Sequence, residues 1–294
     1  MIDVLNAGYM ATLRRLFFIF LLLLPVHPVH AITLTGLAPD SIPKPAFVHT
    51  IGSDIVTALD DGVDIVTAPA RFGTKDWLVA GGLLGGTGLA FIADKDVRAM
   101  MLRNRRDAYG GLSAFGNAYG NGVYAAVAGG CLYFGGLIAD NDGVRETGAM
   151  TLEALAYAGL ITTVTKVVFG RSRPYVDEGP SRFRWFQLED KYLALPSGHC
   201  TVAFALSTVL ARQIDYLPAT ILLYGFAGVT FMHRMYEDRH WLSDTVLGSA
   251  IGYFIADAVV DLHRKCKAKG EQSSILVYPV FSIQGSGIGM AAGL

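Results

Sequence analysis

Residues 233–244 read HRMYEDRHWLSD and hold two histidines, two arginines and three carboxylates. This charged stretch lies between two apolar segments, at about 216–232 and 242–262, whose length and lack of strand-like alternation predict helices. Similar apolar segments precede them at about 77–93, 121–139, 148–169 and 199–213. The sequence therefore predicts an all-α protein, a bundle of about six core helices.

The composition excludes some classes of function. Apolar residues make up 52% of the chain and charged residues only 17%, against about 25% charged in a typical soluble domain. Mean hydropathy is +0.40, so the chain is either a membrane protein or a helical protein with unusually buried helices. The net charge of −1 and the lack of a basic tract argue against a nucleic-acid partner. Three scattered cysteines offer neither a disulfide framework nor a metal-ligand pattern.

The N-terminus resembles an export signal. Arg14 and Arg15 precede the apolar run LFFIFLLLLP, and VHPVHA follows it, a pattern typical of a secretory signal peptide with cleavage after Ala31. An uncleaved anchor is the alternative. We therefore divide the chain into a signal peptide (1–31), an N-terminal exported segment (32–76), a helical domain (77–265) and a C-terminal tail (266–294).

Two of these parts carry weaker patterns. In the exported segment, DIVTAL (54–59) and DIVTAP (64–69) echo each other, by chance or as two short amphipathic turns. In the tail, the β-branched and aromatic residues of SILVYPVFSIQGSGIGMAAGL (274–294), with their Gly-Ser-Gly break, favour a β-hairpin. At the start of the helical domain, Gly81 with Gly85 and Gly82 with Gly86 have the spacing that lets helix backbones approach closely.

Three polar islands interrupt the apolar segments, each at a predicted helix end: KVVFGRSRP (166–174), LPSGH (195–199) and the stretch 233–244. If successive helices run antiparallel, all three islands meet at one end of the bundle. A cluster of Lys, Arg and His with little nearby acid suits an oxyanion such as phosphate. PSGH adds a helix N-terminus, where the backbone N–H groups of Ser197 and Gly198 are free to donate.

The islands resemble the three signature motifs of the type 2 phosphatidic acid phosphatase / vanadium haloperoxidase superfamily. The first motif, Lys, six residues and Arg-Pro, matches Lys166 and Arg173-Pro174. The second, Pro-Ser-Gly-His, matches residues 196–199 in full. The third, Ser-Arg, five residues, His, three residues and Asp, matches Arg234, His240 and Asp244, with His233 in place of the serine.

The resemblance implies a phosphatase that works through a phosphohistidine. His240 is then the nucleophile, His199 the general acid that protonates the leaving group, and Asp244 the partner of the imidazole. The expected phosphate-binding residues are Lys166, Arg173, Ser197, Gly198 and Arg234. No metal or other cofactor is expected, because the fixed cations do what Mg²⁺ does elsewhere.

The residues outside the motifs have less specific interpretations. His233 either supports the site or is a bystander at the membrane or surface boundary. Arg171 reads as a surface charge, and residues 237–239 as a solvated turn or a rim facing substrate. A zinc site built from His199, His233 and His240 is disfavoured, because so many cations crowd these histidines.

The expected substrate is a phosphorylated small molecule or lipid, with monoesters or pyrophosphates as the reacting groups. A vanadate-dependent haloperoxidase is the first alternative, and a non-enzymatic exported membrane protein with a vestigial anion site is the second. We expect membrane association with the site facing the periplasm, with a soluble periplasmic protein as the alternative. If all six segments span, however, an exported N-terminus puts the site in the cytoplasm.

Overall fold

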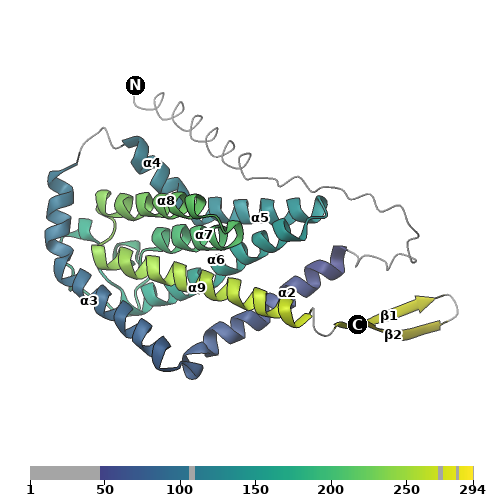
Figure 1. Ribbon diagram of the computed structural model, residues 1–294. Helices are drawn as coiled ribbons and strands as arrows, with labels where there is room; N and C mark the ends of the chain where they lie inside the picture. Colours follow the sequence, from purple (N-terminus) through teal and green to yellow (C-terminus); the bar gives the residue numbers. More distant parts are fainter. Residues whose placement is uncertain (1–46, 106–109, 271–273, 283–284, 294) are drawn as a thin grey trace.

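The computed structural model describes residues 47–105, 110–270, 274–282 and 285–293, and side chains from 50 to 268 within these ranges. Helices make up nearly all of it (Figure 1). The long elements are α2 (Phe47–Thr67), α3 (Thr74–Arg103), α4 (Gly110–Tyr119), α5 (Gly122–Ile138), α6 (Asp142–Phe169), α7 (Gly198–Ile214), α8 (Leu217–Tyr236) and α9 (Leu242–Gly270). Short 3₁₀ turns are η1 (Ala68–Arg71), η3 (Pro174–Val176) and η4 (Asp190–Tyr192).

The all-α prediction is confirmed, and each of the six predicted segments corresponds to one helix, from α3 to α9 with α4 left out. Two described helices were missed. DIVTAL and the first four residues of DIVTAP lie within the single helix α2, and the last two begin η1. The two glycines and several aspartates of α2 obscure its apolar periodicity. The ten-residue α4 contains three glycines and is too short to stand out from a loop.

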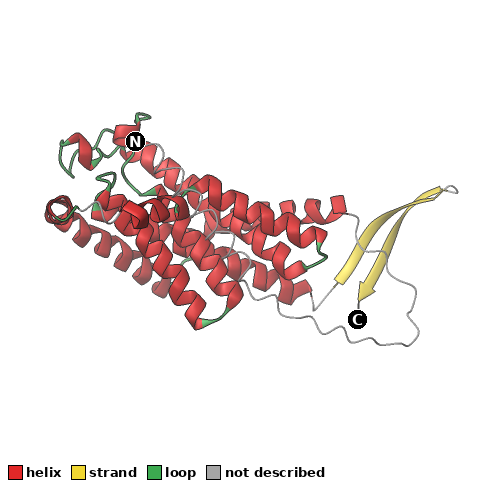
Figure 2. Ribbon diagram, turned by 90° about the horizontal axis from the view of Figure 1, so that it is seen from above, coloured by secondary structure: helices red, strands yellow, loops and turns green. Residues whose placement is uncertain are grey.

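The tail forms the predicted hairpin. β1 (Ser274–Ser282) and β2 (Gly285–Gly293) pair antiparallel, with Ser274 opposite Gly293 and Ser282 opposite Gly285 (Figure 2). The predicted signal peptide lies outside the described residues. The domain limits remain predictions, although α9 continues past residue 265 and α2 precedes residue 77.

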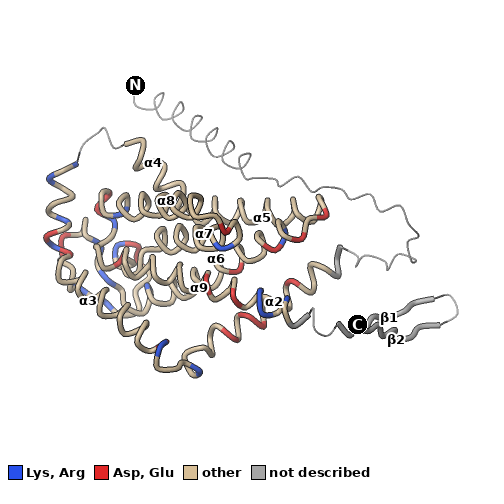
Figure 3. Tube along the Cα trace, in the orientation of Figure 1, with Lys and Arg blue, Asp and Glu red and all other residues tan. Residues whose placement is uncertain are grey.

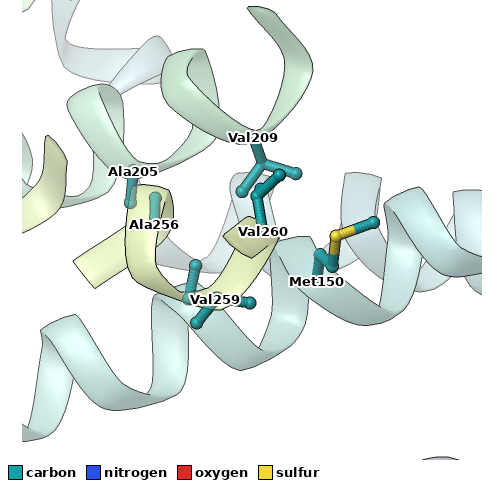
Figure 4. Close-up of a cluster of buried hydrophobic side chains, with 7 residues drawn as sticks. Met150, Ala205, Val209, Ala256, Val259 and Val260 are labelled. Carbon is teal, nitrogen blue, oxygen red and sulfur yellow. The ribbon is translucent and has the colours of Figure 1, made fainter. Parts of the chain in front are cut away.

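The main hydrophobic core lies where α6, α7 and α9 meet. Small and medium-sized side chains fill it, which lets the three helices pack closely. Figure 4 shows this cluster, which consists of Met150, Ala154, Ala205, Val209, Ala256, Val259 and Val260.

Glycines make the closest helix approaches, but not the expected ones. A Cβ added to Gly248 of α9 would lie 2.4 Å from the carbonyl oxygen of Ser197, and one on Gly252 would lie 2.2 Å from that of Thr201. This spacing holds α9 against the first two turns of α7. At Gly81, Gly82, Gly85 and Gly86, by contrast, an added Cβ would meet nothing within 4 Å. Within the described part of the chain, these four glycines therefore do not pack against another helix.

The outer surface of the bundle is apolar. Three helices are long and apolar enough to cross a membrane, namely α3, α6 and α9 up to Ala268, and a fourth span would arise if the bent pair α4 and α5 counts as one. The side chains of Leu84, Leu89 and Ile92 on α3 are exposed in the isolated chain. In Figure 3, α4 and α5 carry no charged residue, whereas charged residues follow α2 along its length. These features support association of the chain with a membrane.

Candidate active site

The segment 190–194, which begins with η4 and runs up to the PSGH motif, gathers three of the predicted site residues. Arg173 donates to the carbonyl oxygen of Asp190 at 2.8 Å and to its carboxylate at 2.6 Å. Lys166 donates through Nζ to the carbonyl oxygen of Leu193. The imidazole of His240 lies 2.8 Å from the carbonyl oxygen of Ala194. Groups separated by up to 74 positions in the chain therefore meet along five residues, which we call the 190–194 loop.

The contact with Ala194 fixes the tautomer of His240. A carbonyl oxygen only accepts, so Nδ1 must carry the hydrogen, and in the neutral imidazole Nε2 then has the lone pair. This correction matters, because Asp244 was expected to hold that N–H. Its Oδ2 lies 3.7 Å from Nδ1, beyond a good hydrogen bond.

Asp244 is instead held in a buried polar network. Its Oδ2 accepts from the backbone N–H of Trp241 at 2.8 Å, and its Oδ1 accepts from Arg171 at 2.5 Å. Arg171 also donates to Asp94 of α3 at 2.6 Å and to the hydroxyl of Ser243 at 2.7 Å. The side chains of Arg171, Asp94 and Asp244 have no exposed surface.

The reading of Arg171 as a surface charge is therefore wrong. Its neighbour Gly170 ends α6 in a left-handed conformation, with φ of +54°, and turns the chain inward. Two signals could have revealed the network. Asp94 is a carboxylate directly after an apolar segment, where a charge needs a partner. Arg171 lies only two positions from motif residue Arg173.

The PSGH motif opens α7 as predicted, but the backbone N–H groups that are free to donate differ from the predicted ones. The Ser197 N–H donates to the carbonyl oxygen of Asp244 at 2.8 Å, so it is not free for an anion. The first N–H inside the helix ladder is that of Thr201, which bonds to the Ser197 carbonyl oxygen at 3.0 Å. The N–H groups of Gly198, His199 and Cys200 therefore form the open helix start. Gly198 lies beside Lys166, whose Cε would be 3.8 Å from an added Cβ.

Arg234 and His233 end α8 at the same site. Both are buried, and the Nε of Arg234 has no hydrogen-bond partner among the described residues. The Oγ of Ser113, on α4, lies 2.7 Å from Nδ1 of His233, and Nε2 of His233 lies 3.4 Å from the guanidinium of Arg234. His233 is thus a buried support of Arg234 rather than a bystander at a boundary.

The fixed positive charges act on the histidines. Burial, followed by the charges of Lys166, Arg234 and Arg173, holds the pKa of His240 well below its ordinary value. Burial, followed by the charge of Arg234, lowers the pKa of His199 to about 3. Both imidazoles are therefore neutral near pH 7 in the empty site. We call the six side chains of Lys166, Arg173, Ser197, His199, Arg234 and His240 the anion cage.

The segment 237–239 differs from the solvated turn expected from the sequence. Asp238 has a positive φ of 56° and is buried, and its carboxylate accepts two hydrogen bonds from Arg98 of α3, at 2.7 and 2.8 Å. A cavity of about 240 Å³ lies against Arg98, Lys95 and Trp241. No cage side chain lines this cavity, so it is separate from the anion cage.

The three histidines of the disfavoured zinc site do not form a metal-ligand cluster among the described residues. The one group with ligand spacing there is Asp61, Glu153 and His263, which lies on other parts of α2, α6 and α9.

Comparison with known proteins supports the resemblance found in the three motifs. The family model of the PAP2 superfamily matches residues 148–268, a range that contains all three motifs. The lipid A 1-phosphatase of Porphyromonas gingivalis is 29% identical over 108 residues, which are 35% of this chain and 21% of that protein. The chain thus spans 21% of the length of this curated relative.

Two solved structures are also similar. LpxE of Aquifex aeolicus has 18% sequence identity and a TM-score of 0.44, over 57% of this chain and 94% of that one. The transmembrane PAP2-type phosphatidylglycerolphosphate phosphatase of Bacillus subtilis has 16% identity and a TM-score of 0.48, over 72% and 96%.

Proposed function

We propose that the chain, whose residues 148–268 match the PAP2 superfamily model, is a phosphatase that hydrolyses lipid-linked phosphate monoesters or pyrophosphates. One observation carries the proposal. A neutral, oriented imidazole at His240 lies among the charges of Lys166, Arg173 and Arg234. Three buried or half-buried cations around one nucleophile match a tetrahedral dianion better than any neutral substrate.

In the first step, the lone pair of His240 Nε2 attacks phosphorus while the bond from phosphorus to the leaving oxygen breaks. The Nδ1–H bond to Ala194 keeps the lone pair on the reactive nitrogen and stabilises the imidazole as it becomes positively charged. His199, protonated once the dianion is bound, transfers its proton to the leaving alkoxide.

In the second step, water attacks the phosphohistidine and the phosphorus–nitrogen bond breaks. His199 now takes the proton from the water, and His240 leaves with its lone pair restored. Lys166, Arg173 and Arg234 stabilise charge on the phosphoryl oxygens in both steps, together with Gly198 N–H. These fixed cations support a reaction at the cage that does not need a metal ion.

The proposed role of Asp244 is to position rather than to react. Through the Trp241 N–H and its own carbonyl oxygen, which accepts from Ser197, it ties the nucleophile segment to the PSGH motif. Arg171 and Asp94 hold Asp244 in turn.

The lipid-linked substrate is supported by the apolar outer surface and by the name of the curated relative, a lipid A 1-phosphatase. A lipid phosphate partitions into the bilayer, so a cage at the end of membrane-associated helices meets its substrate at the interface.

We test the function with the full chain, purified in detergent, against phosphatidate, a prenyl pyrophosphate and a soluble aryl phosphate. The expected result is phosphate release that vanadate inhibits and that persists during brief exposure to EDTA, with lipid substrates preferred. His240→Ala should lower kcat/KM by at least about 10³-fold. An acid-labile, base-stable labelled histidine should form in the parent chain and not in His240→Ala.

Other outcomes would identify the alternatives. Vanadate-dependent halide oxidation without phosphate release would indicate a haloperoxidase. A chain with no activity on the panel, unchanged by His240→Ala, would indicate a vestigial anion site.

We also propose that the chain is exported by its signal-like N-terminus and that the cage faces the periplasm. Labelling of a single cysteine introduced at exposed Arg182, with a membrane-impermeant maleimide in intact cells, tests this. Labelling only after lysis would contradict the proposal.

A further inference from the structure

A second polar cluster lies deep in the bundle and takes no part in the proposed reaction. Asp61 comes from α2, Glu153 from α6 and His263 from α9. One ligand atom from each residue lies within 4.8 Å of the other two. Nε2 of His263 is 2.8 Å from a carboxylate oxygen of Glu153 and 3.5 Å from one of Asp61.

Each carboxylate of this cluster has an oxygen without a hydrogen-bond partner among the described residues. Asp61 and Glu153 are 2% and 6% exposed, and Oδ2 of Asp61 and Oε1 of Glu153 have no hydrogen bond among the described residues. The nearest phenol cannot serve them, because Tyr157 donates to the carbonyl oxygen of Ala58. No described Lys or Arg forms an ion pair with either carboxylate. Buried carboxylate oxygens without hydrogen bonds are costly, and one histidine faces two carboxylates, so this site suits a further cation.

The cluster is remote from the anion cage. Glu153 precedes Lys166 by thirteen residues in one continuous helix, which corresponds to about 20 Å along its axis. Glu153 and His263 also belong to two of the helices long and apolar enough to cross a membrane. An ionisable group in such a helix usually has a functional partner.

The distances suit a small metal ion. Ligand atoms about 2.0–2.2 Å from a tetrahedral ion lie roughly 3.3–3.5 Å apart. The 3.5 Å between His263 and Asp61 meets this spacing, and the 2.8 Å to Glu153 becomes compatible when an ion replaces the hydrogen on Nε2. One imidazole and two carboxylates leave room for a water as fourth ligand.

We propose that Asp61, Glu153 and His263 bind one divalent transition-metal ion of the zinc type, which joins α2 to α6 and α9. The ion supplies two positive charges to two carboxylates, and neutral His263 supplies a nitrogen ligand. Its role is to stabilise the attachment of α2, not to react with phosphate.

The test uses the full chain, freed of any purification tag and dialysed against zinc. Metal analysis should find one zinc per chain, and Co²⁺ substituted for zinc should give the visible absorption of a tetrahedral site. Glu153→Gln and His263→Gln should each weaken zinc binding by at least about 100-fold, beyond the 10–100-fold typical of outer-sphere changes. Zinc should raise the melting temperature of the parent chain and not of these variants.

Asp54→Asn is the matched control. Asp54 lies on α2, the helix of Asp61, and pairs with Arg145 of α6. It does not belong to the metal-ligand cluster. It should keep its zinc and the stabilisation by zinc, even if its melting temperature without metal falls. Phosphate release by each variant at low temperature verifies folding independently. Zinc binding that is absent from the parent chain, or equal in His263→Gln and the parent, would overturn the proposal and leave a cluster that holds only a proton.

Discussion

The guanidinium of Arg171 donates to the carboxylate of Asp244 across 2.5 Å, and neither side chain is exposed. The same guanidinium reaches Asp94 of α3 at 2.6 Å. Arg171 thereby links the end of α6, the start of α9 and the middle of α3. A substitution at this position tests whether the network supports the fold, the cage or both.

We expect Arg171→Met to destabilise the chain by about 3–5 kcal/mol, because it leaves two buried carboxylates without their counter-charge. Thermal unfolding in detergent measures this. Arg182→Met is the control, since Arg182 is on the following loop and more than half exposed, and should change stability by less than about 0.5 kcal/mol. Equal melting temperatures for the two variants would contradict a structural role of the network.

Ser113 and His233 should act as a coupled pair. Their 2.7 Å contact joins α4 to the end of α8, next to Arg234. We expect a double-mutant cycle of Ser113→Ala and His233→Ser to give a coupling free energy of about 0.5–3 kcal/mol in kcat/KM. His233→Ser restores the residue of the family motif and should reduce activity far less than His240→Ala. Purely additive effects would show that His233 acts without Ser113.

Anion binding should be coupled to a proton on His199. In the empty cage the pKa of His199 is about 3, because of burial and the neighbouring positive charges. A bound dianion offsets these charges and raises that pKa. At pH values between the pKa of His199 without the anion and its pKa with the anion, binding therefore takes up a proton. The affinity for tungstate should increase as pH falls through this range. Calorimetry in buffers of different ionisation enthalpy measures the uptake, and His199→Gln should abolish it.

The same shift predicts how stability depends on pH. The unfolded chain binds a proton on His199 near pH 6.5, whereas the folded chain binds it only near pH 3. The contribution of His199 to the free energy of unfolding is therefore complete above pH 6.5 and is lost as pH falls below this value. Tungstate should reduce that loss, because it raises the pKa in the folded state. A melting temperature that is equally sensitive to acid in His199→Gln would contradict this assignment.

Gly248 should tolerate no side chain. Its added Cβ would lie 2.4 Å from the carbonyl oxygen of Ser197, a backbone atom that cannot move without moving the PSGH motif. We expect Gly248→Ala to cost about 1–3 kcal/mol and to lower kcat/KM. Gly81→Ala, at a position with nothing within 4 Å, should leave activity unchanged and stabilise α3 by about 0.5–1 kcal/mol. Similar losses of stability and kcat/KM in both variants would show that the close contact between α7 and α9 does not restrict the residue at 248.

The contrast between these two glycines shows where prediction from sequence succeeds and fails. Gly81 with Gly85 and Gly248 with Gly252 have the same spacing, yet only the second pair packs against another helix. The difference depends on which helix lies opposite, and spacing carries no information about that. Helix lengths were predictable, because apolar runs and breaks are local properties of the chain.

The cage was predictable to the extent that its parts are side chains of unusual type. Lys166, Arg173 and His240 stand out in the sequence, and they do meet along the 190–194 loop. The group that orients His240 could not be predicted in the same way, because it is the backbone carbonyl of Ala194. Nothing about an alanine indicates that its oxygen holds the imidazole of His240.

The main-chain contacts of the 190–194 loop limit how the sequence of this protein can diverge. Main-chain oxygens at Asp190, Leu193 and Ala194 hold Arg173, Lys166 and His240. The half-buried side chain at 193 can therefore be exchanged with little effect on the site, whereas fully buried Ala194 leaves room only for a small residue. Insertion or deletion of even one residue there would shift all three oxygens together. Among homologues, this stretch should therefore keep its length and a small residue at 194, while the residue type at 193 varies.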